Sequence, residues 1–429
     1  MFVCVLALLL FPDPFVNRFI KPRITKAFAQ AYPAYSLRIA NMNCNVFKNH
    51  FGCDSVALNA VDGTFSAEID HISVGGISWM HLLRGDSLAA RDFANADVDA
   101  DAIALSFPQS HYELRCGLLH VSVLDSEAVV DSMALYPLGD DEHFFGESRF
   151  RQTRFRLVVS RARVSGLACL ELLQGKLYCA RSAQIHDVSL DVLINKDKHL
   201  AKDSSRPPMP NEILSSINGT LQLDSLNILN GRLKYCERFA VGSKPALLML
   251  DSMHVSAEGI ANNGVGGAAL VIHAHGNFMK AGTMNVLMSI PVASPELSFQ
   301  YSGTLSGMDL SVLNAFIETA EQKRIKTGVL QAASFDITVA SGRASGNVRA
   351  VYSDLTIAAI NKQTGSDKGF FDGFASAIAK SFKIRGTNVP DKSGSFKIGK
   401  VNYTRRPEEF FLEYSWLALR SGLGDVVGF

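Results

Sequence analysis

The sequence predicts a mainly β protein whose strands form an elongated, twisted antiparallel sheet. Apolar and polar residues alternate almost without pause from Tyr35 to about Tyr301, and turn residues interrupt the alternation at short spacing. Helical spacing of apolar residues is confined to a few short segments, mostly near the ends of the chain. With 42 Lys and Arg against 41 Asp and Glu, the near-neutral charge argues against a nucleic-acid-binding protein.

The N-terminal segment predicts a membrane anchor over residues 1–16, truncated at its start. Phe2 to Phe11 is an unbroken apolar run, whereas a bilayer span needs about 20 such residues. Residues 17–32 carry four cations and apolar residues at helical spacing, which predicts a juxtamembrane amphipathic helix with a kink at Pro22. Two alternatives remain open: a cleaved signal peptide ending near Ala27 to Ala29, and a buried N-terminal element.

Residues 33–205 predict the first segment of the sheet. The expected elements are a hairpin over 35–60, a strand over 65–75 whose alternation slips between Ile69 and Ile72, a short helix near 79–83, a hairpin over 118–130, and at least three strands over 155–194. The turn of the second hairpin is expected at Asp125 and Ser126.

A central segment, residues 206–306, begins with a proline-rich link and one short helix over 206–217. Residues 225–237 then predict a hairpin with a type I′ turn at Asn230-Gly231. In that hairpin one face is apolar and the other is polar apart from Leu229, as in an antiparallel sheet with one wet side. The candidate apolar-face residues are Leu221, Leu223, Leu226, Ile228, Leu233 and Tyr235. An ordinary closed sandwich core is the alternative explanation for these six residues.

The C-terminal segment, residues 307–429, predicts amphipathic helices. One helix starts at an Asp309 cap and runs over 309–325, and a second is expected over 369–382. The last is expected over 407–421, with Pro407 in its first turn and Gly422 ending it.

Two cysteine pairs predict cross-strand disulfides, which would imply an oxidising compartment. A two-residue turn at Lys48-Asn49 would place Cys44 opposite Cys53 at a non-hydrogen-bonded position. Cys169 and Cys179 bracket a similar turn. The alternative is that all four are small buried thiols.

The sequence offers no catalytic constellation, so we expect neither enzymatic activity nor a cofactor or metal. His273 and His275 share one side of a strand without acidic or thiol ligands nearby. Asp97, Asp99 and Asp101 match the first acids of a calcium loop, but its glycine and final glutamate are missing. A glycine-rich stretch over 264–269 precedes a strand and not the helix that a dinucleotide site requires.

Several stretches resemble the bacterial AsmA-like family. They are YSGTLSGMDLSVLNAFIE (301–318), IKTGVLQAASFDITVASGRASGNVRAVYSDLTIAAI (325–360), GKVNYTRRPEEFFLEYSWLALRSGLGDVVGF (399–429), YSLRIANMNCNVFKNHFGCDSVAL (35–58), ISVGGISWMHLLRGDSLAARDFANADV (72–98) and INGTLQLDSLNILNGRLKYCERF (217–239). The likeness is patchy but spans most of the chain, and its motifs are structural.

The resemblance implies an open trough of β-strands that is anchored in the inner membrane and projects into the periplasm. Proteins of this kind, related to bridge-like lipid transfer proteins, carry phospholipid along an apolar groove and support the lipid balance of the outer membrane. It also implies an outer-membrane or periplasmic partner protein. An assembly factor that binds β-rich clients by strand addition is the alternative. An outer-membrane barrel is a third interpretation, disfavoured by the predicted C-terminal helices.

Overall fold

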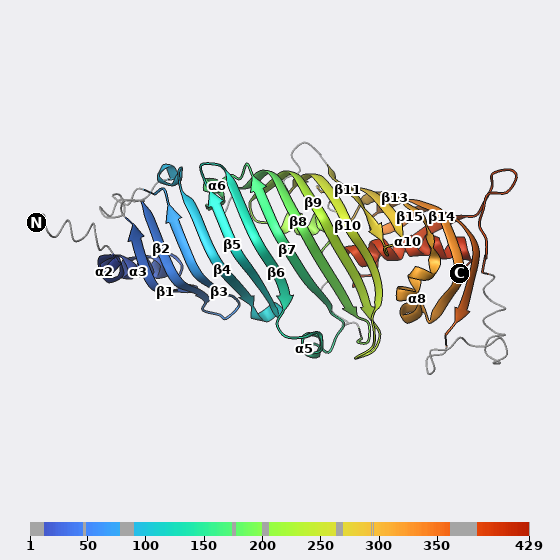
Figure 1. Cartoon of the computed structure of the whole chain (residues 1–429), viewed down its shortest axis with the longest axis horizontal. Helices are drawn as coiled ribbons and strands as arrows, with labels where there is room; N and C mark the ends of the chain where they lie inside the picture. Colours follow the sequence, from blue (N-terminus) through green and yellow to red (C-terminus); the bar gives the residue numbers. More distant parts are fainter. Residues whose placement is uncertain are drawn as a thin grey trace, which may run out of the picture. The chain divides into compact units, whose positions relative to one another are not determined.

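The computed structural model describes residues 13–45, 49–77, 90–173, 177–199, 206–262, 269–292, 294, 296–360 and 384–428. Its strands form one open sheet of 16 strands, and each strand pairs with its neighbours in the sequence, from β1 to β16 (Figure 1). The prediction of a mainly β, largely antiparallel fold is therefore confirmed.

The strands are β1 (Tyr35–Asn45), β2 (His50–Ala60), β3 (Ser66–Gly75), β4 (Asp97–Phe107), β5 (Tyr112–Ser122), β6 (Glu127–Pro137), β7 (Thr153–Ser165), β8 (Leu177–Asn195), β9 (Thr220–Arg238), β10 (Ala246–Ala261), β11 (Ala269–Phe278), β12 (Gly282–Pro291), β13 (Phe299–Asp309), β14 (Lys323–Ala340), β15 (Arg343–Ala359) and β16 (Ile398–Thr404). The helices are α2 (Asp13–Phe15), η1 (Val16–Ile20), α3 (Lys21–Ala31), η2 (Ala90–Phe93), η3 (Pro108–Ser110), α5 (Asp141–Gly146), α6 (Cys169–Leu173), α7 (Pro210–Ser216), η5 (Leu310–Leu313), α8 (Asn314–Glu321) and α10 (Phe411–Val427).

Contacts divide the chain into two units. The first unit comprises residues 1–144 and 155–188, and therefore β1 to β6, most of β7 and the start of β8. The second unit comprises residues 145–154 and 189–429, which include β9 to β16. Among the described residues, no helix is long and apolar enough to cross a membrane. Residues 1–12 of the predicted anchor lie outside the described part of the chain.

In the first unit, a helix over residues 13–31 runs beside the free edge of β1. It consists of α2, a π-helical turn η1, and α3 with Pro22 near its start. Side chains four residues apart bind the backbone of the strand: Asp13 accepts from the Cys44 amide at 2.9 Å, and Lys21 donates to the Ala40 carbonyl at 2.8 Å. Between them, the Asn17 amide group bonds both backbone groups of Met42. The helix thus satisfies edge groups that would otherwise be open to another strand.

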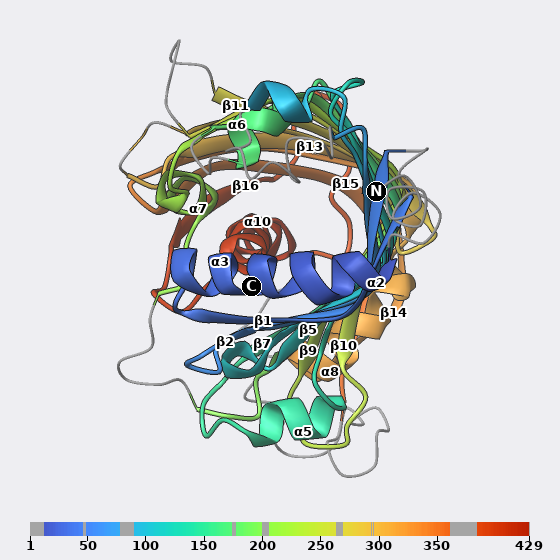
Figure 2. The ribbon, with the colours of Figure 1, turned by 90° about the vertical axis from the view of Figure 1, so that its left-hand side faces the viewer.

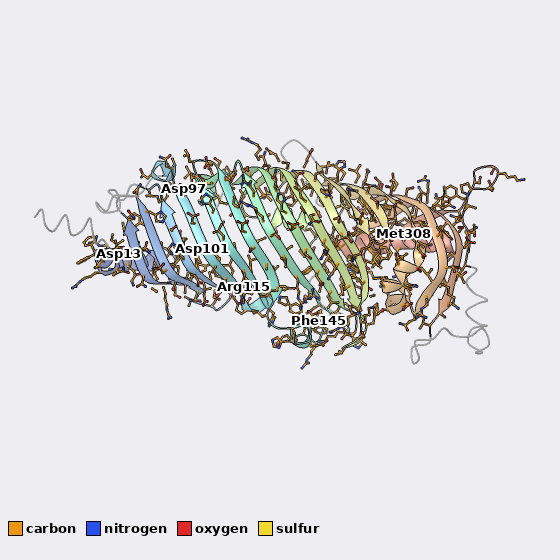
Figure 3. The ribbon with its side chains drawn as sticks, in the orientation of Figure 1. Asp13, Asp97, Asp101, Arg115, Phe145 and Met308 are labelled. Atoms are coloured by element: carbon orange, nitrogen blue, oxygen red, sulfur yellow. The ribbon has the colours of Figure 1, made fainter. Side chains whose placement is uncertain are left out.

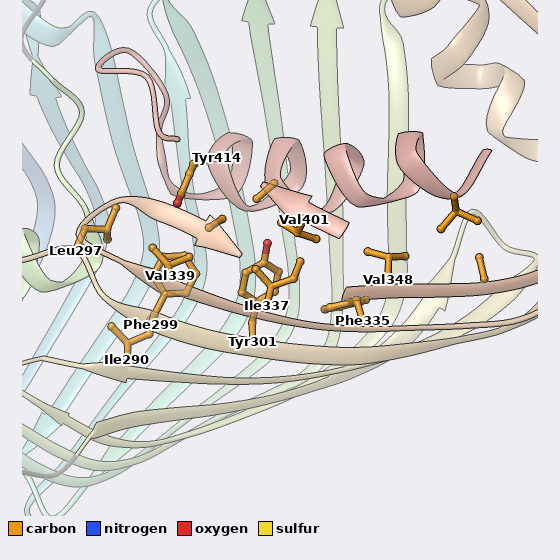
Figure 4. Close-up of a cluster of buried hydrophobic side chains, with 14 of the residues drawn as sticks. Ile290, Leu297, Phe299, Tyr301, Phe335, Ile337, Val339, Val348, Val401 and Tyr414 are labelled. Carbon is orange, nitrogen blue, oxygen red and sulfur yellow. The ribbon is translucent and has the colours of Figure 1, made fainter. Parts of the chain in front are cut away.

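In the second unit, α10 packs against the apolar face of β13 to β16, and the strands curve around it (Figure 2). Tyr414, Ala418 and Val426 of this helix have no exposed surface. They belong to a core with the buried side chains of the strands, among them Phe299, Tyr301, Phe335, Ile337, Val339, Val348 and Val401 (Figure 4). The Tyr301 hydroxyl donates to the Ser415 carbonyl at 2.9 Å.

The first turn of α10 is attached to the ends of β8 and β9 through buried charges. The Lys196 ammonium lies 2.7 Å from one Glu237 oxygen and 3.2 Å from one Glu413 oxygen. Both carboxylates are buried, at 3% and 7% exposure. Burial raises the pKa of Glu413 above its ordinary value, although Lys196 acts in the opposite direction.

Several predicted elements are confirmed and others are wrong. Asp309 caps the predicted helix by accepting from the Ser311 amide at 2.7 Å, and α7 forms in the proline-rich link. The helix after Asp309 is shorter than the predicted range 309–325, because α8 ends at Glu321 and β14 begins at Lys323. The range 155–194 holds two strands with α6 between them, not three strands. The last helix begins at Phe411 and continues through Gly422 to Val427, because Gly422 packs on the sheet and does not end the helix. The predicted helices over 79–83 and 369–382 lie outside the described residues.

The hairpin predicted for residues 225–237 is wrong, because these residues belong to the single 19-residue strand β9. Asn230 does adopt the left-handed conformation, with φ of 58°, but the chain continues in the same direction. Leu226 and Ile228 therefore pair with Ala257 and Val255 of β10.

Replacing Gly399 by alanine should destabilise the second unit. A Cβ atom at this position would lie 2.1 Å from the carbonyl oxygen of Gly422, so α10 lies directly against β16 here. The helix would have to move, which should cost about 1–3 kcal/mol and lower the melting temperature. Gly146→Ala is the control, since a Cβ atom there meets no atom within 4 Å. Equal melting temperatures for the two variants would contradict this close contact.

The raised pKa of Glu413 predicts a pH-dependent stability. The folded state holds this proton to higher pH than the unfolded chain, whose carboxyl has a pKa near 4.5. The stabilisation that protonated Glu413 contributes is therefore complete below pH 4.5, and it is lost as pH rises through the pKa of Glu413 in the folded state. Glu413→Gln should remove this loss, so the melting temperature of the variant relative to wild type should increase from pH 4.5 to pH 8. An equal difference in melting temperature between variant and wild type at pH 4.5 and at pH 8 would contradict the raised pKa of Glu413.

A candidate binding surface on the apolar face of the sheet

In the first unit, one face of the sheet is apolar over seven strands. Because partners in an antiparallel sheet point to the same side, the pairings define continuous rows of side chains. Three of these rows are Leu37–Leu58–Ala67–Leu105–Leu114–Leu135–Leu157, Met42–Cys53–Ile72–Ala100–Leu119–Val130–Ala162 and Cys44–Phe51–Val74–Val98–Val121–Ala128–Val164. We call the surface formed by these three rows the apolar face.

The opposite face of the same strands is mostly polar. One row reads Asn41–Asp54–His71–Asp101–Leu118–Asp131–Arg161. His71 and Asp54 are 2.7 Å apart, as are His120 and Asp99 in the next row. Asp97 and Asp101 of β4 and Arg115 of β5 lie on this side (Figure 3). The aspartates that matched part of a calcium loop are thus members of the polar face.

The apolar face has no second layer among the described residues of the first unit. The one element outside the sheet in extensive contact with its strands is the helix over residues 13–31, which packs against β1. Most side chains in the three rows are half-buried, and few are fully buried. A sheet with one apolar face normally buries that face against another layer. The described residues therefore leave most side chains of the three rows partly exposed.

A crease crosses the strands of the first unit at one level. Each strand has two consecutive outward-facing residues there, so the alternation slips by one position while neighbouring strands stay in register. The residues on the crease are all exposed: Ala40, Ser55, Asp70, Ala102, Gly117, Ser132 and Ser160. Three of them, on alternate strands, have φ of 50° to 57°. An extra residue of this kind bends a strand, so the crease bends the sheet along its whole row.

The six predicted residues lie on the apolar side of β9 in the second unit, and we call this side the apolar face of the second unit. Leu223 pairs with Ile260, Leu226 with Ala257, Ile228 with Val255, Leu233 with Leu250, and Tyr235 with Leu248; Leu221 follows by alternation. Leu221, Leu223, Leu226, Ile228 and Leu233 are half-buried. The rows continue into the core that α10 covers, for example Leu226–Ala257–Ile272–Met288–Tyr301–Ile337.

Tyr235 departs from the prediction of an open groove position. It is 6% exposed and packs against Phe316 of α8, with ring centroids 6.5 Å apart. Its hydroxyl donates to Glu237 at 2.7 Å, and burial raises its pKa well above the ordinary value. For this residue the alternative of a closed core is the correct one.

The predicted disulfide register is wrong at the first pair. Cys44 lies opposite Phe51, and Cys53 lies opposite Met42, because the β1–β2 turn is longer than the two residues assumed. Within the described residues, Cys44, Cys53, Cys169 and Cys179 form no disulfide. Burial raises the pKa of the first three thiols, which lowers their reactivity.

Sequence reasoning missed most of the apolar face, because the predicted site was confined to β9. The signal that could have found the rest was the slip in alternation between Ile69 and Ile72, which recurs in every strand of the first unit. Comparison of the sequence with models of known families finds no match, and comparison with curated proteins finds none either. The AsmA-like resemblance therefore stays a prediction.

The crease predicts that valine destabilises β4 more at Ala102 than at Ala104. Ala102 has φ of 50°, a conformation that a β-branched residue strongly disfavours. Ala102→Val should lower the free energy of unfolding by about 1–2 kcal/mol, whereas Ala102→Gly should not lower it. Ala104→Val, two residues away in regular strand conformation, is the matched control in chemical denaturation. The crease would be refuted at this strand if both valine variants unfolded at the same denaturant concentration.

Proposed function

We propose that this chain is a non-enzymatic lipid-binding protein whose apolar face holds the acyl chains of phospholipids. The observation that carries the proposal is a face of three apolar rows over seven strands without a second layer among the described residues. Moving an acyl chain from water onto such a surface is favourable by about 0.8 kcal/mol for each buried CH₂ group. The headgroup can stay in water at the rim, so no buried charge is required.

The proposal includes a place in the cell and a direction of action. An N-terminal segment would anchor the chain in the inner membrane, with the sheet in the periplasm, and phospholipid would move along the apolar face to support the outer membrane. This part rests on the AsmA-like resemblance and on the apolar run from Phe2 to Phe11. A periplasmic or outer-membrane partner would receive the lipid.

The second candidate function, assembly of β-rich clients by strand addition, has less support. Strand addition needs a free sheet edge. At β1, backbone groups of Ala40, Met42 and Cys44 are already bonded to side chains of the helix over residues 13–31. At β16, which is seven residues long, the Lys400 amide donates to Asp425 at 2.7 Å. Both edges are thus partly occupied.

The proposal predicts that phospholipid can be crosslinked to the apolar face. The full chain would be incubated with vesicles that contain phosphatidylethanolamine bearing a photoreactive acyl chain, and irradiated. Mass spectrometry should find the crosslinks on peptides of β4 to β6 and β9. In Leu119→Gln and Ile228→Gln, a lost contact worth on the order of 1 kcal/mol should lower the crosslinking yield about fivefold.

The chain supplies matched controls for this experiment. Leu118 and Leu229 adjoin the two test residues on the same strands but lie on the polar face, at 37% and 36% exposure. Leu118→Gln and Leu229→Gln should keep the wild-type yield. Equal losses on both faces, or no crosslink to a folded chain, would reject lipid binding by the apolar face.

A further inference from the structure

The polar face of the second unit contains a hollow that the proposed function does not use. Its volume is about 720 Å³, and residues of every strand from β9 to β15 line it. This size lies within the range of small-molecule sites in proteins, which is about 300–1,000 Å³.

Two rows of side chains form the sides of the hollow. One row reads His254–His275–Asn285–Thr304–Ser334–Arg349, and the other reads Asn227–Ser256–His273–Leu287–Ser302–Asp336. Between them runs the row from Ile228 to Phe335, whose side chains point to the opposite, apolar side. The floor of the hollow is therefore backbone.

Most of these side chains both donate and accept hydrogen bonds. Serine and threonine hydroxyls, asparagine amides and neutral imidazoles all have this dual character. The charges of Arg349 and Asp336 offset one another. Within the described part of the chain, His254, His273 and Arg349 make no side-chain hydrogen bond or ion pair, so their polar groups are available.

The shape of the hollow selects an extended ligand. The first row crosses six strands, and at about 4.8 Å between strands it is about 24 Å long. The rings of His254 and His275 are stacked, with centroids 6.2 Å apart, and give the row a flat surface at one end. Leu229 and Leu287 line the hollow at 36% and 43% exposure and add apolar contacts.

Other ligand classes fit less well. The described residues hold no group of three or more His, Cys, Asp or Glu placed to bind a metal ion. An acyl chain would leave the two polar rows without partners. A polyanion would meet one arginine and the repulsive carboxylate of Asp336.

We propose that this hollow binds a neutral, linear oligosaccharide that lies across the strands. Sugar hydroxyl groups are both donors and acceptors, and they match the two rows of dual-character side chains. The apolar C–H faces of the sugar rings match the imidazole stack and the two exposed leucines.

The test is calorimetric titration of the full chain with cellohexaose, maltohexaose and the hexamer of N-acetylglucosamine. At least one should bind with a dissociation constant of about 10 µM to 1 mM. The double variant His275→Ala, Asn285→Ala should weaken that binding at least tenfold at an unchanged melting temperature. The control is Glu258→Ala, at an exposed position outside the hollow on β10, which should bind as wild type does.

Three results would overturn the proposal. They are no binding by any of the three hexasaccharides, equal affinity in the double variant, and binding of polygalacturonate in preference to all three. Each is independent of lipid binding, because the two polar rows of the hollow and the row that contains Ile228 point to opposite sides of the second unit's strands.

Discussion

The separation of mainly apolar from mainly polar side chains between the two faces of each unit's strands is the constraint on which this structure depends. Each strand contributes to both faces, so the rows on one face are mainly apolar and most rows on the other are mainly polar. The apolar rows must be removed from water, and a single-layer sheet cannot do this with its own strands. In the second unit α10 covers these rows over β13 to β16 and builds a core around Tyr414. In the first unit the described residues provide no such cover.

Two features of the second unit follow from that covering. A helix can reach the floor of a curved sheet only where side chains are small, and Gly399 and Gly422 meet at that place. At the start of the helix, the Lys196 ammonium contacts two buried carboxyl groups, those of Glu237 and Glu413. These contacts fix the position of α10 more than they add stability, because the free-energy cost of removing the charges from water offsets their mutual attraction.

The alternation of residues was enough to predict the fold class, and local signals were less reliable. Asn230-Gly231 is a strong hairpin signal, yet it lies within β9 because the strand pairs along its whole length with β10. In the sequence, Gly422 resembles the glycine that ends a helix. It lies within α10 and contacts distant strands, and no local sequence pattern contains that contact. Cys44 and Cys53 were misplaced by two positions, since the pairing of β1 and β2 depends on a turn length that composition does not determine. The alternation in β9 does not reveal that Tyr235 is buried, because Phe316 of α8 covers it from far along the chain.

The helix beside β1 shows how a helix can keep regular contacts along the edge of a strand. Its contacts recur every four residues, whereas those of the strand recur every two. Four residues of α-helix advance about 6 Å, and two residues of strand advance about 6.6 Å, so the two repeats nearly match in length. They do not match in angle, because four α-helical residues turn about 40° past the starting direction. The wider π-helical turn from Val16 to Ile20 winds less per residue and offsets this drift, which keeps Asp13, Asn17 and Lys21 in phase with the strand.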